Sequence, residues 1–316
     1  MSVHKSCLLL LSLLCWAGVL PAMPLKDREV NSGPPPAVYL DSLGRDFVLE
    51  KPVSRVVSLL PAATEILFAI GAGDLAVGIT EYCDYPPEAQ SLPRVGGFSG
   101  ATVSVEQIAM LMPGLVLISA DMHYRIADLL DELGIPFFAV EPRNFADVYS
   151  VISIIGELTG REEGAGRVIA GMKEKLKTAE IRAALSIEKQ KKSGADPEIP
   201  SVFWVLSSEP LMSIGGNTIL NEAIKLAGGR NIFEDMKEDW PLVSFEEVLK
   251  AKPDWILSAD DMGSALDTML LSRREFSRLI PAVEKGRTVN LDADLVYRYG
   301  PRLADGVLAI TALLHP

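Results

Sequence analysis

The sequence predicts an α/β protein made of two similar Rossmann-like lobes, joined by a long α-helical connector, with a ligand cleft between the lobes. Three observations support this prediction. Short apolar runs alternate with helical patterns in both halves of the chain, as in parallel sheets that are covered by helices. A long stretch of helical composition separates the two halves, and the halves share a repeated motif.

A leader precedes the first lobe. Lys5 stands before an apolar run from Cys7 to Leu20, and this run is too short for a comfortable transmembrane span. A basic residue, an apolar core and then small residues are typical of a secretory signal peptide. We therefore predict a signal peptide over residues 1–22, cleavage near Ala22 and a periplasmic location for the mature chain.

A lipid anchor is the alternative outcome for this leader. Bacterial lipoproteins are cut just before a lipidated cysteine, and Cys15 is the candidate. Small residues are expected before such a cysteine, but Leu13 and Leu14 stand there, so cleavage near Ala22 is favoured. Cys83 is then the single cysteine of the mature chain, which excludes an intramolecular disulfide. It is either a small packed residue or a reactive thiol.

The N-terminal lobe is expected over residues 39–146, after a flexible arm at 23–38. Its strands are predicted from short apolar runs and its helices from helical spacing that stops at glycine or proline. In chain order we expect strands at 38–40, 47–49 and 55–60, a helix at 64–70, a strand at 77–79, a helix at 105–112, a strand at 115–118, a helix at 125–133 and a strand at 137–140.

A helical connector is expected over residues 147–186, and the C-terminal lobe over residues 187–316. Several glycines in the connector mark either a break or close packing; they are Gly156, Gly160, Gly164, Gly166 and Gly171. After a polar loop at 190–200, the second lobe is expected to contain a strand at 201–206, helices at 219–226 and 245–251, a strand at 255–258, a helix at 274–279, a strand at 288–291 and a last helix from about 301.

The two lobes share a repeat. VSVEQIAMLMPGLVLISADM, which begins at Val103, matches VSFEEVLKAKPDWILSADDM, which begins at Val243. Both units are predicted to open with a capping box, Ser104 with Gln107 and Ser244 with Glu247. Each unit is then a helix, a turn and a buried strand. Two such lobes have their largest crevice between them, and the carboxyl-end loops of their sheets face it.

Composition and motifs exclude several classes of function. A net charge of −12 argues against nucleic acid, whose partners are basic. The sequence has three histidines and no P-loop, GxSxG elbow or GxGxxG motif, so a secreted α/β enzyme is only a remote alternative. His123 is expected near the mouth of the cleft. It is there either a solvated loop residue or a ligand for a bound metal.

Aromatic residues on predicted loops favour ligand binding. The 81–98 loop, EYCDYPPEAQSLPRVGGF, is stiffened by prolines and turned by Gly96-Gly97, so that it presents side chains. Aromatic residues in a cleft provide apolar contact for a flat, bulky ligand. Asp294, Arg298 and Arg302 flank one of them and can orient the ligand's amides or acids. The aromatic residues are Tyr82, Phe98, Trp240 and Tyr297.

Two acidic residues occupy matching positions in the repeat. Glu106 and Glu246 each lie in the first turn of a predicted helix, directly after its serine cap. The helix dipole favours a glutamate there, which is a sufficient structural reason. The repeat nevertheless puts one such acid on each lobe. Together they would form a docking surface for a basic partner that contacts both lobes.

Four segments resemble the periplasmic substrate-binding proteins of ABC importers. The resemblance extends from about Tyr39 to the end and is to the group that has a rigid helix between lobes and handles iron-siderophores, haem and cobalamin. It implies a monomeric receptor with no catalytic activity and no resident cofactor, whose bound ligand is a corrinoid or an iron chelate. The segments are RVVSLLPAATEILFAIG, YCDYPPEA, VGGFSGATVSVEQIAMLMPGLVL and DWPLVSFEEVLKAKPDWIL.

The resemblance is strongest to the cobalamin-binding members and implies roles for individual residues. By the family's motifs, Tyr82, Phe98, Trp240 and Asp294 would contact the ligand, and Glu106 and Glu246 would pair with arginines of the permease. Tyr297 and Arg298 lie beside these residues and complete the expected site.

Two residues depart from the family's pattern. Phe98 stands where the cobalamin binders have tryptophan, and Met212, also an expected ligand contact, stands where an aromatic residue is common. Both departures weaken the case for cobalamin over an iron-siderophore or haem, and neither affects the case for an import receptor.

Overall fold

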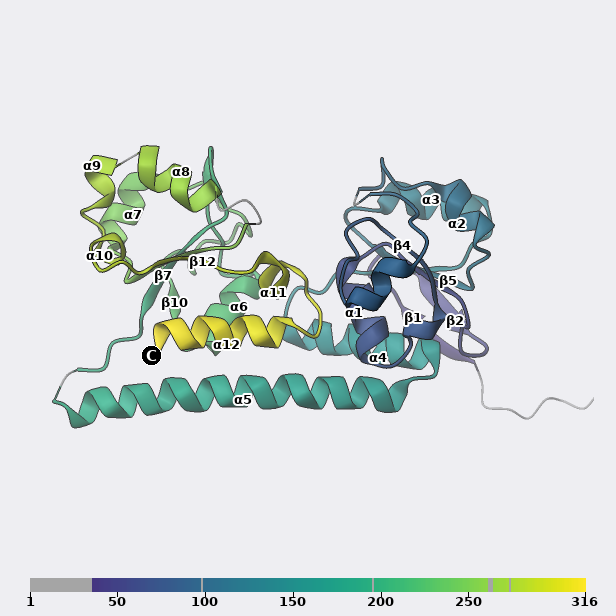
Figure 1. The fold of residues 1–316 in the computed structure, drawn as a ribbon, viewed down its shortest axis with the longest axis horizontal. Helices are drawn as coiled ribbons and strands as arrows, with labels where there is room; N and C mark the ends of the chain where they lie inside the picture. Colours follow the sequence, from purple (N-terminus) through teal and green to yellow (C-terminus); the bar gives the residue numbers. More distant parts are fainter. Residues whose placement is uncertain (1–35, 98, 195, 261–263, 273) are drawn as a thin grey trace, which may run out of the picture. The chain divides into compact units, whose positions relative to one another are not determined.

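The computed structural model describes residues 36–316, except residues 98, 195, 261–263 and 273. The predicted signal peptide, most of the arm, Cys15 and Phe98 therefore lie outside the described residues. The described chain contains two four-stranded parallel sheets, and the long helix α5 runs beside both (Figure 1).

The two sheets have the same strand order. In the first it is β4-β3-β5-β6, and in the second it is β10-β7-β11-β12. In both, therefore, the first strand lies between the second and the third. This confirms the predicted pair of similar α/β lobes. The strands are β3 (Val56–Ser58), β4 (Ala76–Ile79), β5 (Leu115–Ser119) and β6 (Phe137–Val140) in the first lobe, and β7 (Ser201–Val205), β10 (Arg230–Asn231), β11 (Trp255–Ser258) and β12 (Thr288–Asn290) in the second.

In the N-terminal lobe, the first helix begins at a proline and is followed by a glycine. Pro61 starts α1 (Pro61–Ala69), where a missing N–H costs nothing. Gly71 then takes a φ of 84° directly after the helix, a conformation that favours glycine. An antiparallel hairpin of β1 (Ala37–Leu40) and β2 (Asp46–Leu49) precedes the sheet. The other helices are α2 (Val105–Met110), α3 (Tyr124–Glu132) and 3₁₀ turns at Gly73–Leu75 and Pro87–Ser91.

The C-terminal lobe contains several short elements that the sequence did not predict. A two-residue strand has no measurable periodicity, so β8 (Ser207–Ser208), β9 (Leu211–Met212) and β10 escaped detection. The helices of this lobe are α6 (Ile219–Leu226), α7 (Phe245–Ala251), α8 (Ser264–Ser272), α9 (Arg274–Ser277), α10 (Pro281–Glu284), α11 (Ala293–Tyr297) and α12 (Leu303–Leu314).

The connector consists of two helices. Helix α4 (Phe145–Thr159) ends at Gly160, which has a φ of 67°, and α5 (Glu162–Lys192) follows. Gly160, one of the five glycines noted in the connector, therefore marks a break between two helices. Helix α5 has 31 residues, about 46 Å of helix. It continues to Lys192, beyond the predicted end at residue 186, so the polar loop begins later than expected. Its last turns carry charged, helix-favouring residues.

Helix α5 packs against both lobes. Its Met172 and Ala179 belong to one buried cluster that also contains Val56 of the first sheet and Val202 of the second. Polar contacts accompany this packing. Lys175 Nζ lies 2.6 Å from Asp305 Oδ1, and Arg182 Nε donates to the His315 carbonyl at 2.8 Å. The two sheets are thus connected through one apolar core along this helix.

Two glycines of α5 have opposite environments. A Cβ on Gly164 would lie 1.9 Å from the carbonyl oxygen of Ile70, whereas a Cβ on Gly166 would meet nothing within 4 Å. We expect Gly164→Ala to lower the free energy of unfolding by about 2 kcal/mol, because α5 must move away from α1. Gly166→Ala should raise it by about 0.5–1 kcal/mol, because alanine is the better helix former.

Urea denaturation of the two variants measures both effects. Similar changes in the two proteins would contradict close packing at Gly164, since helix propensity alone acts equally on both.

Candidate functional site

Four of the predicted ligand-binding residues line one cavity between the lobes. Tyr82 comes from the N-terminal lobe, and Asp294, Tyr297 and Arg298 come from the C-terminal lobe. The cavity has a volume of about 450 Å³, within the usual range for small-molecule sites. Most of its other lining residues are apolar, among them Leu60, Ile66, Met122, Val140 and Val151.

A second cavity adjoins the first and contains Trp240. Its volume is about 720 Å³, and it shares Glu141, Pro142 and Tyr299 with the first cavity. We call the two together the cleft. Met212 is not among the residues described as lining either cavity; it lies in β9 and pairs with Ser207. The structure therefore brings five of the predicted residues to the cleft and leaves Met212 outside.

The cleft lies at the carboxyl ends of the first sheet's strands. Leu60 follows β3, Ser119 ends β5 and Glu141 follows β6, and all three line the first cavity. Open α/β sheets bind ligands in the crevice outside the carboxyl ends of their strands. The predicted position of the ligand cleft is thus where the structure has its inter-lobe cavities.

The 81–98 loop is anchored beneath its exposed tyrosines. Arg94 Nη1 donates to the Thr80 carbonyl at 2.7 Å and to the Cys83 carbonyl at 3.2 Å. Cys83 is buried, with its Sγ 3.1 Å from Thr80 Oγ1, and burial raises the pKa of its thiol. Of the two interpretations from the sequence, a small packed residue and a reactive thiol, the structure supports the packed residue. Tyr82 is 55% exposed above this anchor.

Glu65 is the centre of an ion network that crosses between the lobes. It lies in α1 with a side chain that is 1% exposed. Arg302 of the other lobe donates to both carboxylate oxygens, from Nε at 2.9 Å and from Nη2 at 2.6 Å. Arg298 Nη1 lies 3.5 Å from Glu65 Oε1. Burial raises the pKa of Glu65, and the hydrogen bond from Arg302 acts in the opposite direction.

Two further carboxylates complete the network. Arg298 donates to Asp84 Oδ1 at 2.6 Å and lies 2.8 Å from Asp294 Oδ1. Desolvation would raise the pKa of Asp84, but the hydrogen bond and charge of Arg298 lower it. Arg302 also donates to Asp294 Oδ2, at 3.3 Å. The 81–98 loop and α11 are thus joined by charge-assisted hydrogen bonds.

Tyr297 is more constrained than the sequence suggested. It was predicted on a loop, but it ends α11 and accepts a hydrogen bond from Trp204 Nε1 at 3.2 Å. Burial raises the pKa of its phenol. The fully buried Trp204 lies in β7, so this contact depends on tertiary structure. Tyr297 therefore contributes to the core as well as to the cavity wall.

His123 is not at the mouth of the cleft. The interpretation as a solvated loop residue is wrong, because the side chain is fully buried. The interpretation as a ligand for a bound metal stays a prediction, and His123 is not among the residues described as lining either cavity. Its Nδ1 accepts a hydrogen bond from the Ser119 backbone N–H at 3.1 Å. His123 therefore helps to hold the turn between β5 and α3.

Glu106 and Glu246 are exposed in the first turns of α2 and α7. The buried residues of these helices pack on the sheet faces opposite α5, since Val105 and Val248 belong to separate outer clusters. Figure 1 shows both helices on that side.

The helix caps of α2 and α7 differ from each other. Ser244 and Glu247 form the predicted capping box. The Ser104 hydroxyl accepts from Gln107 N and donates to Glu106 Oε2 at 3.0 Å. The Ser104 backbone N–H donates to the Val95 carbonyl at 2.9 Å and not to the Gln107 side chain, so the predicted capping box is incomplete at α2. Hydrogen bonds with its own backbone N–H and with Ser104 lower the pKa of Glu106.

Several cleft residues were not singled out by sequence reasoning. A signal did exist for Glu65, because an acidic residue inside the apolar helix PAATEILFA calls for a buried partner. The lining residues Asp121, Glu141 and Asp239 were not singled out, although Asp121 lies in the repeated segment that begins at Val103 and Asp239 opens the segment DWPLVSFEEVLKAKPDWIL. They meet only because loops from different lobes converge.

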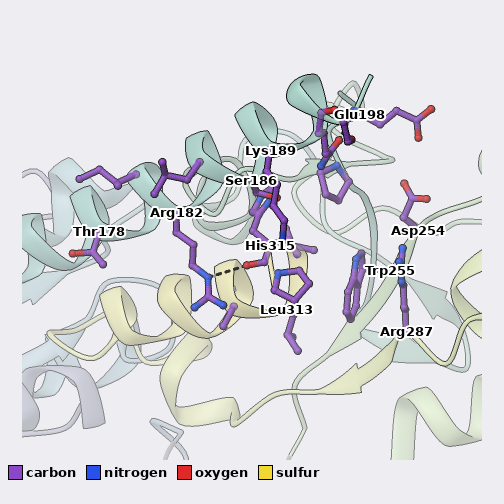
Figure 2. Close-up of a pocket in the computed structure, with 18 residues that line it drawn as sticks. Thr178, Arg182, Ser186, Lys189, Glu198, Asp254, Trp255, Arg287, Leu313 and His315 are labelled. Carbon is purple, nitrogen blue, oxygen red and sulfur yellow. Dashed lines mark hydrogen bonds between the residues drawn. The ribbon is translucent and has the colours of Figure 1, made fainter. Parts of the chain in front are cut away.

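A larger cavity lies outside the cleft. It has a volume of about 1130 Å³ and is formed by the second half of α5, the end of α12 and the start of β11. Figure 2 shows Arg182 and Lys189 of α5 facing His315, Trp255 and Arg287, with the bond from Arg182 to the His315 carbonyl dashed. None of the predicted site residues lines this cavity.

The described chain shows neither a metal-binding cluster nor a membrane-spanning helix. No group of three or more histidine, cysteine, aspartate or glutamate side chains there could hold a metal ion. Among the same residues, every helix is too short or too polar to cross a membrane.

Comparison with known proteins identifies several similar proteins that are named as binding proteins. Residues 56–295 match the model of the periplasmic binding protein family. The uncharacterized ABC transporter substrate-binding lipoprotein YvrC of Bacillus subtilis (strain 168) is 31% identical over 286 residues, which cover 89% of this chain and 86% of that protein. The vitamin B12-binding protein of Yersinia pestis (strain Pestoides F) is 32% identical over 204 residues, 64% of this chain and 68% of the relative.

A solved structure shares the fold. The periplasmic heme-binding protein RhuT from Roseiflexus sp. RS-1, in its apo form, superposes with a TM-score of 0.70 at 25% identity. The match covers 83% of this chain and 98% of that one.

Proposed function

Because this chain belongs to the periplasmic binding protein family, we propose that it is the solute receptor of an ABC importer. It captures a metal-bearing macrocycle or chelate in the cleft and delivers it to a membrane permease. The observation that carries the proposal is the apolar cavity to which both lobes contribute, with Tyr82 and Tyr297 in its wall. The family is one of binding proteins, and the receptor role requires no chemical step.

Cobalamin is the first candidate ligand. Support comes from the relative that is named a vitamin B12-binding protein and from the aromatic side chains in the cleft, which suit a flat macrocycle. Haem or an iron-siderophore is the second candidate, and the similarity to a heme-binding protein supports it. Phe98 and Met212, which depart from the cobalamin pattern, also favour this second candidate.

The receptor is proposed to act as a monomer outside the cytoplasmic membrane. Its leader would be removed near Ala22. Lipidation at Cys15 is the alternative, and the relative named a lipoprotein supports it. Delivery is proposed to use Glu106 and Glu246, one on each lobe, to contact basic residues of the permease.

Ligand titration of the purified mature chain tests the proposal. We expect calorimetry to detect binding of at least one of cyanocobalamin, haemin and a ferric hydroxamate. Tyr82→Ala and Trp240→Ala should each weaken that binding by about 1–3 kcal/mol, because an exposed aromatic residue in a cleft provides contact area and little core packing. Trp240 is 44% exposed. Both variants should keep the wild-type melting temperature.

Tyr124→Ala is the matched control, because Tyr124 is similarly exposed on α3 and lines neither cavity. Its affinity should equal that of the wild type. Failure of all three compounds to bind would refute the proposed ligand class. Normal binding by unstable Tyr82 or Trp240 variants would make those two residues structural.

A further inference from the structure

We propose that the cleft selects metal chelates that are neutral or cationic, and that it discriminates against chelates bearing free carboxylates. This inference rests on the proposed function and narrows its ligand class. It follows from how the charges of the cleft are already paired. Proteins recognise the carboxylates of a ligand chiefly through guanidinium and ammonium groups. Whether the cleft binds such a ligand therefore depends on whether its arginine side chains are available for pairing.

Arg298 is the cation that lines the first cavity, and its charge is already matched. Its contacts are with Asp84 Oδ1 at 2.6 Å, Asp294 Oδ1 at 2.8 Å and Glu65 Oε1 at 3.5 Å. The side chain is 14% exposed. A carboxylate of the ligand would have to compete with three carboxylates of the protein for this group. Its approach would cost desolvation without a new ion pair.

Arg302 is equally engaged. It binds Glu65 through two donors and Asp294 through a third contact. Its Cζ also lies 3.8 Å from the centroid of the Tyr85 ring, which covers one face of the guanidinium. The side chain is 17% exposed, and Arg302 is not among the residues that line either cavity. It therefore offers no binding surface to an anion.

The remaining charged residues that line the cleft are mostly acidic. Asp121, Glu141 and Asp239 surround the second cavity. The cation described among its lining residues is Arg143, which is exposed, so solvent screens its charge and three carboxylates oppose it. Ser119 Oγ donates to Glu141 Oε2 at 2.8 Å, which fixes one of these carboxylates. Carboxylates accept hydrogen bonds, so they match ligand groups that donate, such as carboxamides and ammonium groups.

Tyr299 lines both cavities, as does Glu141. Burial is the first cause of its raised pKa, and the neighbouring Tyr297 and the charges of Glu141 and Asp239 raise it further. A phenolate at this position would thus experience repulsion from two carboxylates. A ligand carboxylate would experience the same repulsion.

Pairs of related probes, of which one member carries additional free carboxylates, test the inference. The pairs are cyanocobalamin with its monocarboxylic acid, ferrioxamine B with its N-succinyl derivative, and haemin dimethyl ester with haemin. For each chelate that binds, calorimetry should give a Kd at least about tenfold higher for the form with the added carboxylate. The ratio should fall as salt is raised from 0.05 to 0.5 M, because screening weakens the repulsion.

The triple variant Asp121→Asn, Glu141→Gln, Asp239→Asn should reduce the same ratio, whereas Glu163→Gln, on the outer surface of α5, should not. Equal or tighter binding of the carboxylate forms would overturn the inference and leave the proposed function standing. So would a ratio that is unchanged in the triple variant. If no probe of any pair binds, the proposed function itself fails, and the inference fails with it.

Discussion

Arg302→Ala should lower the free energy of unfolding at pH 7 by about 3 kcal/mol or more, which is the expected cost of leaving one partner of a buried ion pair unmatched. Glu65, with a side chain that is 1% exposed, would lose its two shortest hydrogen bonds. Arg298, at 3.5 Å, is too distant to replace them. Urea denaturation followed by circular dichroism measures the change.

The loss should also depend on pH. Burial raises the pKa of Glu65, and Arg302 opposes that rise, so the variant's carboxyl would protonate at a higher pH than that of the wild type. A carboxyl with a raised folded-state pKa destabilises the fold above that pKa, and the penalty disappears below the unfolded value, about 4.3. The difference between variant and wild type should therefore be larger at pH 7 than near pH 4.

Lys177→Ala is the control, because it removes an exposed ion pair with Glu180. Exposed pairs contribute at most about 1 kcal/mol, so its stability should remain close to that of the wild type. An Arg302→Ala protein as stable as the Lys177→Ala protein would show that Glu65 is held by other contacts.

Under the docking role proposed for Glu106 and Glu246, reversing both charges, Glu106→Lys with Glu246→Lys, should strongly reduce import while leaving the protein folded and able to bind its ligand. The two side chains are exposed on α2 and α7, so their replacement disturbs no core. Two repulsive contacts would then replace two attractive ones at a basic permease surface. In reconstituted vesicles we expect the rate of uptake to fall at least about tenfold. A single reversal should have a smaller effect, because the other lobe can still dock.

Glu163→Lys with Glu180→Lys provides the matched control. Both residues are exposed glutamates of α5, and the change in net charge is the same. Uptake should continue at the wild-type rate with this control. If the Glu106 and Glu246 reversals also support wild-type uptake, the two residues stabilise helix starts and do nothing more.

The sequence by itself determined the elements that local pattern encodes. Strand-length apolar runs, glycine stops and the repeat at Val103 and Val243 predicted two α/β lobes with a cleft at their carboxyl ends. The two sheets have one strand order, which confirms this architecture. Tyr82, Asp294, Tyr297 and Arg298 were also predicted as cleft residues, from aromatic residues expected on loops, the charged residues that flank one of them and the resemblance to the family, and all four line the first cavity. Patterns of apolar runs, turns and repeats involve residues that are close in the chain, so the sequence alone contains them.

Only the tertiary structure decided which side chains meet. Whether Arg298 is available to a ligand depends on Glu65 and Asp84, which belong to the other lobe. His123 is buried rather than solvated for the same kind of reason. Of two glycines in one helix, Gly164 abuts the Ile70 carbonyl and Gly166 abuts nothing. These outcomes depend on contacts between residues far apart in the chain, and a periodicity of two or 3.6 residues carries no information about them.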